Sequence, residues 1–206
     1  MKLHVHYCPS GLSNCYILGS GSPSNEAPLQ AVIIDPGNMA PAILATIEEN
    51  DYTLIGILIT HDHSHHVRGV KTIMKIYDTE IYAITPEIME HRTTVIKDGD
   101  TISIGQFRTE VISIPGHSAD SAVFKIGRLL FTGDVLSAGL LGKTASSYAA
   151  ITQRSALQGK IFSLPGDYTI LPGHGPPSSL KAERHFNLGL NSCEQQKKPR
   201  FEFWFD

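Results

Sequence analysis

Four times in this chain, an apolar segment suited to a buried strand ends in a short loop that carries histidine or aspartate. These loops comprise residues 60–66, 115–117, 132–134 and 172–175. Short apolar runs such as Leu54–Ile59 are typical of strands covered on both faces. When several such strands end at one edge of a sheet, the loops that follow them meet there. The pattern therefore predicts a sheet-based fold in which one edge gathers polar side chains at a shared point.

The first of these loops, residues 60–66, reads Thr-His-Asp-His-Ser-His-His. Neutral imidazole is the commonest side-chain metal ligand. His61 and His63 are two residues apart and point the same way if the strand geometry persists, whereas His65 and His66 point elsewhere and could serve a second ion. The alternative interpretation is a solvated, histidine-rich turn that binds metal only adventitiously. Distant residues decide between the two interpretations.

The other three loops supply such distant residues. Each of His117, Asp134 and His174 directly follows a glycine at the end of an apolar segment. Glycine permits a close approach of the backbone and unusual dihedral angles. Any one of these loops, taken alone, is more typical of an ordinary turn. Together with the histidine cluster, they indicate a metal site at the sheet edge.

Composition argues against several classes of function. The 206 residues carry a formal net charge of -3, and no basic stripe indicates a nucleic-acid partner. No apolar run reaches the length of a membrane span, and Met1–Cys8 lacks the apolar core of a secretory signal. The three cysteines are scattered, which fits reduced thiols in the cytoplasm better than disulfides. We therefore expect a cytoplasmic protein that acts on a small molecule, without nucleic-acid or membrane partners.

Strands and helices alternate in each half of the sequence, with additional antiparallel strands between residues 101 and 131. The pattern predicts helices over residues 41–50, 67–77, 148–164 and 179–190. It predicts strands over residues 2–7, 14–18, 31–35, 54–59, 80–84, 101–104, 108–114, 122–126, 128–131 and 168–171. This order indicates the α/β class, with helices that cover sheets in a sandwich, and one domain over residues 1–206.

The C-terminal segment, at about residues 194–206, ends in the aromatic sequence Phe-Glu-Phe-Trp-Phe-Asp. An exposed aromatic segment is costly, so we expect it to pack either on its own domain or on a second copy in a homodimer. Its alternation of aromatic with other residues suits an added strand. Nothing in the sequence separates the two options.

The chain resembles the metallo-β-lactamase fold hydrolases over nearly its whole length. The matching pieces, in order, are Ser13–Tyr16, Asp35–Gly37, Thr60–His66, Pro115–Ser118, Thr132–Asp134 and Pro172–Gly175. Within that superfamily it is most similar to the glyoxalase II-like thioester hydrolases, particularly their short bacterial members. The resemblance implies an αβ/βα four-layer sandwich with a two-metal site between the sheets, in which zinc is usual and iron or manganese also occur.

The same resemblance implies a role for each candidate ligand. The first metal would be bound by His61, His63 and His117, the second by His66 and His174, and Asp134 would bridge them. A further aspartate, Asp120, stands close to the first group, either as an outer partner of a ligand histidine or as a solvated loop carboxylate.

One position departs from the family pattern His-x-His-x-Asp-His, because His65 stands where aspartate is usual. That aspartate binds the second metal and orients the attacking water, so position assigns His65 as a second-metal ligand and a catalytic residue. Imidazole can bind a transition metal but brings no negative charge, which leaves Asp134 as the shared carboxylate. The alternative is a displaced His65 side chain and a one-metal enzyme.

The implied reaction is hydrolysis of a thioester or related acyl substrate by a metal-bound hydroxide, with Asp134 holding the ions. Lys143 lies in a Gly-Lys segment that resembles the glutathione-contacting part of glyoxalase II. It either binds a substrate carboxylate or is an ordinary surface lysine. Two alternatives stand beside this function. One is a persulfide dioxygenase-like oxidoreductase with one iron on His61, His117 and Asp134, and the other is a weakly active metal-binding protein.

Overall fold

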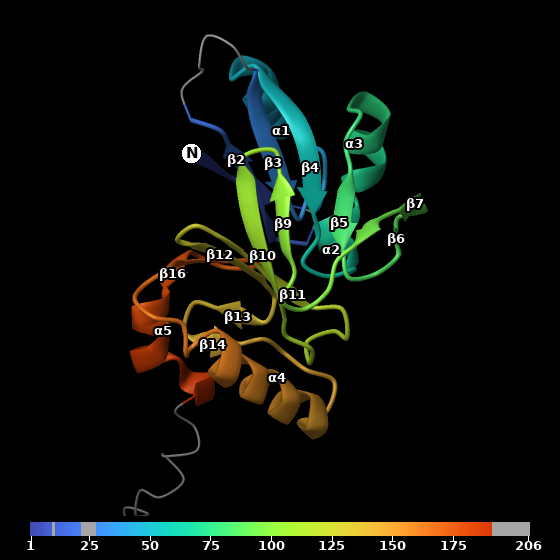
Figure 1. Cartoon of the computed structure of the whole chain (residues 1–206). Coiled ribbons are helices and arrows are strands. Elements are labelled where there is room, and N and C mark those ends of the chain that lie inside the picture. Colours follow the sequence, from blue (N-terminus) through green and yellow to red (C-terminus); the bar gives the residue numbers. More distant parts are fainter. Residues whose placement is uncertain (10, 22–27, 191–206) are drawn as a thin grey trace, which may run out of the picture.

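The computed structural model describes residues 1–9, 11–21 and 28–190, in which two six-stranded sheets dominate (Figure 1). The first sheet, in spatial order, consists of β1 (Lys2–Cys8), β2 (Ser13–Gly19), β3 (Leu29–Ile34), β4 (Tyr52–Leu58), β5 (Ile81–Ala83) and β8 (Thr94–Val95). The second consists of β16 (Ser178–Ser179), β15 (Thr169–Pro172), β12 (Leu129–Gly133), β11 (Ala122–Ile126), β10 (Phe107–Ser113) and β9 (Thr101–Ile104). Two short hairpins lie outside these sheets, β6 (Glu87–Ile88) with β7 (His91–Arg92) and β13 (Leu136–Ser137) with β14 (Leu140–Leu141). The helices are α1 (Pro41–Glu49), α2 (Ser64–Val67), α3 (Val70–Ile76), α4 (Ser147–Lys160) and α5 (Leu180–Phe186).

Three apolar clusters show how these elements are layered. One joins the first sheet to α1 and α3, and includes Ile47 and Ile73. Another joins the second sheet to α4 and α5, and includes Leu157. The third fills the space between the sheets, where the rings of Tyr16 and Phe131 pack edge to face at 5.4 Å. The order helix, sheet, sheet, helix confirms the predicted αβ/βα four-layer sandwich, and Figure 1 shows α1 and α3 far from α4 and α5.

Successive residues of one strand pack against different layers, because side chains alternate between the two faces of a sheet. In β12, Leu130 packs in the cluster under α4 and α5, whereas Phe131 packs between the sheets. Ile170 and Leu171 of β15 divide in the same way. β12 and β15 are parallel neighbours that pair Leu130 with Ile170, so the loops that follow them leave the same sheet edge. The predicted convergence of strand-end loops is therefore present.

At this edge, hydrogen bonds join the two sheets directly. The backbone N–H of Asn14 in β2 donates to the carbonyl oxygen of Gly173 at 2.7 Å. The buried Tyr16 hydroxyl, also in β2, donates to the carbonyl oxygen of Pro172 at 2.6 Å. These bonds fix the loop after β15 against the first sheet, and so fix the site's two halves relative to each other.

The helix expected over residues 67–77 is divided in the structure into α2 and α3. Gly69 lies at the division, and its N–H donates to the Pro36 carbonyl oxygen at 2.8 Å. A Cβ added to Gly69 would lie only 2.6 Å from that oxygen. Close packing against the loop after β3 therefore explains both the glycine and the break, and it lets α2 begin at Ser64, within the histidine cluster.

The helices expected over residues 148–164 and 179–190 end earlier than the sequence predicts, at Lys160 and Phe186. The sequence predicted a longer helix because apolar residues continue past Lys160. In the structure the first of them, Ile161, is the C-cap of α4 and packs in the core from a turn. In α5, Ser179 is the N-cap, and its hydroxyl accepts from the Ala182 N–H at 3.1 Å. Asn187 ends this helix with an extended backbone.

Within the described residues, every helix is too short or too polar to cross a membrane. The aromatic tail expected at about residues 194–206, with its two packing options, lies outside the described residues.

Candidate metal centre

Asp134 lies at the centre of the site, on the loop that leaves β12. The preceding Gly133 has a φ of +48°, which favours glycine, and an added Cβ would lie 2.4 Å from Thr60 Oγ1. The glycine thus lets the loop turn in close contact with the loop that carries the histidine cluster. Asp134 is mostly buried and presents its two carboxylate oxygens to two different groups of histidines.

The first group consists of His61, His63, His117 and Asp134, whose ligand atoms all lie within 4.8 Å of one another. Asp134 Oδ2 lies 3.8 Å from His61 Nε2 and 3.6 Å from His117 Nε2. His63 Nδ1 lies 3.0 Å from His117 Nε2. The structure therefore brings together the residues that the sequence assigned to the first metal.

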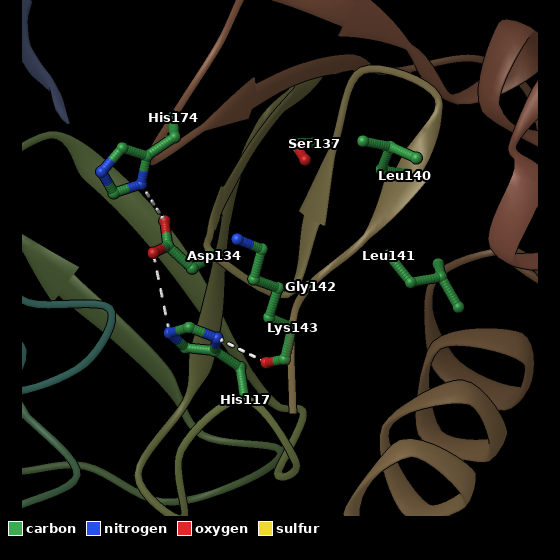
Figure 2. A pocket seen from close by; sticks show the side chains of 8 residues that line it. All are labelled: His117, Asp134, Ser137, Leu140, Leu141, Gly142, Lys143 and His174. Atoms are coloured by element: carbon green, nitrogen blue, oxygen red, sulfur yellow. Dashed lines mark hydrogen bonds and ion pairs between the residues drawn. The ribbon is translucent and has the colours of Figure 1, made fainter. Parts of the chain in front are cut away.

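The second group consists of His66, His174 and Asp134. Asp134 Oδ1 lies 2.7 Å from His174 Nδ1 and 3.4 Å from His66 Nε2. Figure 2 shows the carboxylate between His174 and His117, with a different oxygen directed at each. One carboxylate is thus shared by the two groups, in the place that the sequence assigned to a bridging residue.

On the exposed side of the site, backbone carbonyl oxygens fix the ring orientation of two of these histidines. His117 Nδ1 donates to the carbonyl oxygen of Lys143 at 2.9 Å, which leaves Nε2 directed at Asp134. His174 Nε2 donates to the carbonyl oxygen of Gly11 at 3.1 Å, which leaves Nδ1 directed at Asp134. Each ring therefore has a fixed orientation and one nitrogen that faces the centre.

On the buried side, Asp35 orients the histidine rings, although from the sequence it was expected only at the end of a predicted strand and in a segment that matches the family. Its Oδ2 lies 3.2 Å from His66 Nδ1 and accepts from the Thr60 hydroxyl at 2.6 Å, while Oδ1 accepts from the Thr60 N–H at 2.8 Å. Thr60 Oγ1 in turn lies 3.0 Å from His61 Nδ1. The sequence signal that could have indicated this role is Asp-Pro-Gly directly after β3. Because β3 is the parallel neighbour of β4, the loops that follow the two strands leave the same sheet edge.

The donor set fits a divalent transition metal. Ligand histidines usually give their second ring nitrogen to a carboxylate, carbonyl or other polar group, as His61, His66, His117 and His174 do. His61 Nε2 is buried, and no described group forms a hydrogen bond with it. A bound ion would satisfy this nitrogen. Groups of imidazoles with one carboxylate suit zinc, iron and manganese.

Burial and neighbouring charge set the protonation of these groups. Burial, helped by the charge of His66, lowers the pKa of His61 to about 3. Burial disfavours the charged form of His66, but hydrogen bonding and charge from Asp134 and Asp35 outweigh it and raise that pKa to about 10. Burial likewise opposes ionisation of Asp134, yet hydrogen bonds from His174 and His66 hold its pKa well below the usual range. The centre therefore keeps a carboxylate anion at neutral pH.

His65 stands apart from both groups. Its ring centroid lies 5.5 Å from that of His174 and 6.2 Å from that of His63. Among the described residues, it belongs to no cluster whose ligand atoms lie within 4.8 Å of one another. Its backbone is fixed, because the Ser13 hydroxyl donates to the His65 carbonyl oxygen at 2.6 Å. The side chain lies half-buried at the rim of the site, beside the second group.

Asp120 has a role that neither sequence interpretation included. Its Oδ2 accepts a hydrogen bond from the backbone N–H of Asp62 at 2.8 Å. The carboxylate thereby fixes the backbone between His61 and His63, two members of the first group. It acts on the loop that carries the histidines rather than on a histidine ring.

A pocket of about 330 Å³ opens beside Asp134 (Figure 2). It is lined by His117, Asp134, Ser137, Leu140, Leu141, Gly142, Lys143 and His174. In Figure 2 the Lys143 side chain extends into the pocket, toward Asp134. The structure thus places the candidate substrate-binding lysine next to the candidate metal ligands, with room for a small molecule between them.

The hydroxyacylglutathione hydrolase of Hahella chejuensis (strain KCTC 2396) is a relative of this chain in sequence. It is 32% identical over 149 residues, which cover 70% of this chain and 56% of the relative. The chain thus spans little more than half the length of that protein.

Solved structures share the fold at lower sequence identity. The BLEG-1 B3 metallo-beta-lactamase matches with a TM-score of 0.80 and 23% identity, over 92% of this chain and 99% of that one. TTHA1623 in a di-iron-bound form matches with a TM-score of 0.73 and 24% identity, over 89% of this chain and 98% of that one. Residues 10–174 also match the family described as the Metallo-beta-lactamase superfamily. The chain therefore belongs to the metallo-beta-lactamase superfamily.

Proposed function

We propose that this protein is a metal-dependent hydrolase whose substrate is a thioester or a related small acyl compound. The observation that carries this proposal is the shared position of Asp134. One carboxylate oxygen faces His61 and His117 at 3.8 and 3.6 Å, and the other faces His174 and His66 at 2.7 and 3.4 Å. A carboxylate between two histidine groups suits a two-ion site. The likeness to a hydroxyacylglutathione hydrolase supports an acyl-thiol substrate.

Two divalent ions at such a site supply a water of lowered pKa and polarise a substrate carbonyl. The chain's own residues prepare that site. Asp134 contributes negative charge between the groups, while Asp35, Thr60 and backbone carbonyls hold the histidine rings in fixed orientations. Because these groups are already placed in the folded protein, little reorganisation is needed when a substrate binds.

We assign a role in substrate binding to Lys143. Its ammonium group would attract a substrate carboxylate into the pocket beside Asp134. The Lys143 carbonyl oxygen accepts from His117 Nδ1 at 2.9 Å, so the backbone of this lysine is tied to the first group. A lysine fixed in this way is better placed for recognition than one on an open surface.

His65 is assigned to the second-metal side, as a ligand and catalytic residue by position. Its ring lies 5.5 Å from His174, close enough for a side-chain rotation to bring it to the second group. Without a second carboxylate there, we expect the second ion to be held more weakly than the first. Zinc is the proposed metal, and iron is the main competitor because TTHA1623 has a di-iron-bound form.

A second candidate function rests on the first group alone. His61, His117 and Asp134 form a set of two histidines and one carboxylate, with the histidines 3.8 and 3.6 Å from Asp134 Oδ2. Such a set is typical of one-iron oxygenases. This observation supports a persulfide dioxygenase-like oxidoreductase, in which the absence of aspartate at position 65 would matter less.

The deciding experiment loads the purified full chain with zinc, iron or manganese and counts the ions per chain. Hydrolysis is followed by the thiol released from acyl-glutathione and simpler thioesters, and oxidation by oxygen consumption with a persulfide. Asp134→Asn is the test variant, and Asp51→Asn is the matched control, because it lies at an exposed turn at the opposite end of β4 from the histidine loop.

Thiol release that Asp134→Asn reduces by about 100-fold or more, with Asp51→Asn unchanged, would support the hydrolase. Oxygen consumption with one iron per chain, and no thiol release, would replace it with the oxidoreductase. Metal binding without either reaction would leave only a metal-binding protein.

A further inference from the structure

The hairpin β13–β14, residues 136–141, forms the side of the pocket opposite His117 and His174 (Figure 2). Its two cross-strand pairs are Leu136 with Leu141 and Ser137 with Leu140. Because directly opposed residues share a face, each pair belongs to one face of the hairpin. Leu136 is fully buried in the cluster under α4 and α5, and Leu141 packs against that cluster. The hairpin is thus anchored on the core through one pair.

The other face of the hairpin is open toward the pocket. Leu140 is 53% exposed although it lines a pocket beside a carboxylate and several imidazoles. Leu141 belongs to the face that packs against the core, but it is only partly buried and also lines the pocket. An exposed leucine is common on a protein surface, but two leucines in the wall of a pocket are placed to contact an apolar group of a ligand.

A buried carboxylate fixes the tip of this hairpin. Glu183 of α5 is only 2% exposed, and its two oxygens each lie 3.1 Å from the backbone N of Gly139, which donates to them. The same carboxylate accepts from the Ser178 hydroxyl at 2.6 Å and from the Asn187 side chain at 2.7 Å. A buried carboxylate is retained at a cost unless such donors satisfy it, and here they do.

The turn that Glu183 holds depends on this contact. Gly139 has a φ of +78°, so the turn needs a conformation that favours glycine. Its carbonyl oxygen accepts from the Leu188 N–H at 2.9 Å, so both polar groups of Gly139 bind residues of α5 or directly after it. The backbone of Leu140, the next residue, is therefore positioned by α5 and the residues after it rather than by either main sheet.

From these contacts we infer that Leu140 and Leu141 select substrates that carry a short apolar chain, and that Glu183 is the positioning residue of this wall. The inference rests on the proposed function, because it names a substrate class for the same pocket. The pocket volume of about 330 Å³ is at the lower end for small-molecule sites, which favours a chain of a few carbons over a long fatty acid.

The test compares two series of thioesters with the metal-loaded protein. In one the acyl chain lengthens from two to six carbons with a fixed thiol, and in the other the thiol lengthens with a fixed acetyl group. We expect kcat/KM in one series to rise about two- to fourfold per methylene. Leu140→Ala should reduce the preference for the longest over the shortest member about fivefold, mainly through KM. Ile151→Ala, at an exposed residue of α4 outside the pocket wall, is its matched control and should leave that preference unchanged.

Glu183→Gln keeps the shape of the side chain but weakens its acceptance of the Gly139 N–H. We expect it to raise KM for the longest substrate about three- to fivefold, with kcat and KM for the acetyl substrate within about twofold of the parent. Glu49→Gln, at an exposed residue of α1, is its matched control. Thermal unfolding confirms that each variant is folded, and Leu140→Ala tests the inference even if Glu183→Gln does not fold.

Binding of the straight-chain carboxylates butanoate, hexanoate and octanoate, measured by calorimetry, gives a readout that does not need turnover. Affinity that rises with chain length, and rises less in Leu140→Ala, supports the inference even if no thioester is hydrolysed, in which case only the proposed function fails. Hydrolysis that is insensitive to chain length in both series, or equally sensitive in Leu140→Ala, overturns the inference while the hydrolase proposal stands.

Discussion

Gly173→Ala should disable the centre without removing any proposed ligand. A Cβ at this position would lie 2.4 Å from Asp134 Oδ1 and 2.6 Å from His66 Cε1. The backbone cannot move away easily, because the Gly173 N–H donates to Gly133 at 2.8 Å and its carbonyl oxygen accepts from Asn14 at 2.7 Å. Ordinary contact needs about 3.4 Å, so the Asp134 oxygen must move by about 1 Å.

A shift of that size is large for this chemistry. Metal–ligand distances are held within about 0.2 Å, and a misplacement of about 1 Å can cost about 100-fold in rate. We expect Gly173→Ala to lose the second ion first, because His66 and Asp134 Oδ1 are both displaced. Overpacking should also lower the free energy of unfolding of the metal-free protein by about 1–3 kcal/mol.

The assay is metal content by mass spectrometry after dialysis against zinc, combined with urea unfolding of the metal-free chain. Gly159→Ala is the matched control, because a Cβ there meets no atom within 4 Å and the residue lies in α4. It should stabilise the protein by up to about 1 kcal/mol. If Gly173→Ala retains the parent's metal content and turnover within about twofold, the placement of Asp134 and His66 against Gly173 is wrong.

Three further outcomes are expected. His65→Asp should raise thioester turnover or retention of the second ion, because it adds a carboxylate beside the second group, and no change in either would contradict the role given to His65. Tyr16→Phe should lower the free energy of unfolding by about 1 kcal/mol in urea titrations, because it removes the buried 2.6 Å hydrogen bond to Pro172, and an unchanged midpoint would refute this. The Lys160 hydrogen bond lowers the pKa of Asp98, so its stabilisation is fully present above about pH 4 and is lost as pH falls through the lowered value. Because both groups are partly exposed, Asp98→Asn should cost less than about 1 kcal/mol at pH 7, and paired denaturation curves should show this cost shrinking as pH falls below about 4.

The histidine groups could be anticipated from sequence because their signal is local. His61, His117, Asp134 and His174 each stand just beyond an apolar strand, and parallel pairing of β12 with β15 brings two of those strand ends together. The alternation of strands and helices also predicts sheets covered by helices, whereas the αβ/βα four-layer form was implied by the resemblance to the family. The features that could be predicted are thus those that depend on a single strand and the loop directly after it.

The residues that hold the site in place carry no such local signal. Asp120 binds a backbone N–H that is 58 residues away, and Glu183 binds Gly139 from 44 residues away. Glu183 looks like an ordinary surface acid in the sequence, and Asp120 is distinguished only by its nearness to His117. Neither partner could be identified, because it is a main-chain group with no characteristic residue type. Asp35 differs only in its Asp-Pro-Gly context, which indicates a turn as readily as it indicates a partner for His66.

The junction between β2 and the loop after β15 has a consequence for how the protein is made. Ser13 forms an isolated bridge with His174, and the Asn14 side chain donates to Pro172 and Gly175 at 3.0 and 2.7 Å. During synthesis β2 emerges early, yet these partners are translated about 160 residues later. Contacts so distant in sequence form late and slowly. The centre can therefore be completed only when the two ends of the domain have met, and capture of metal there would mark the end of folding.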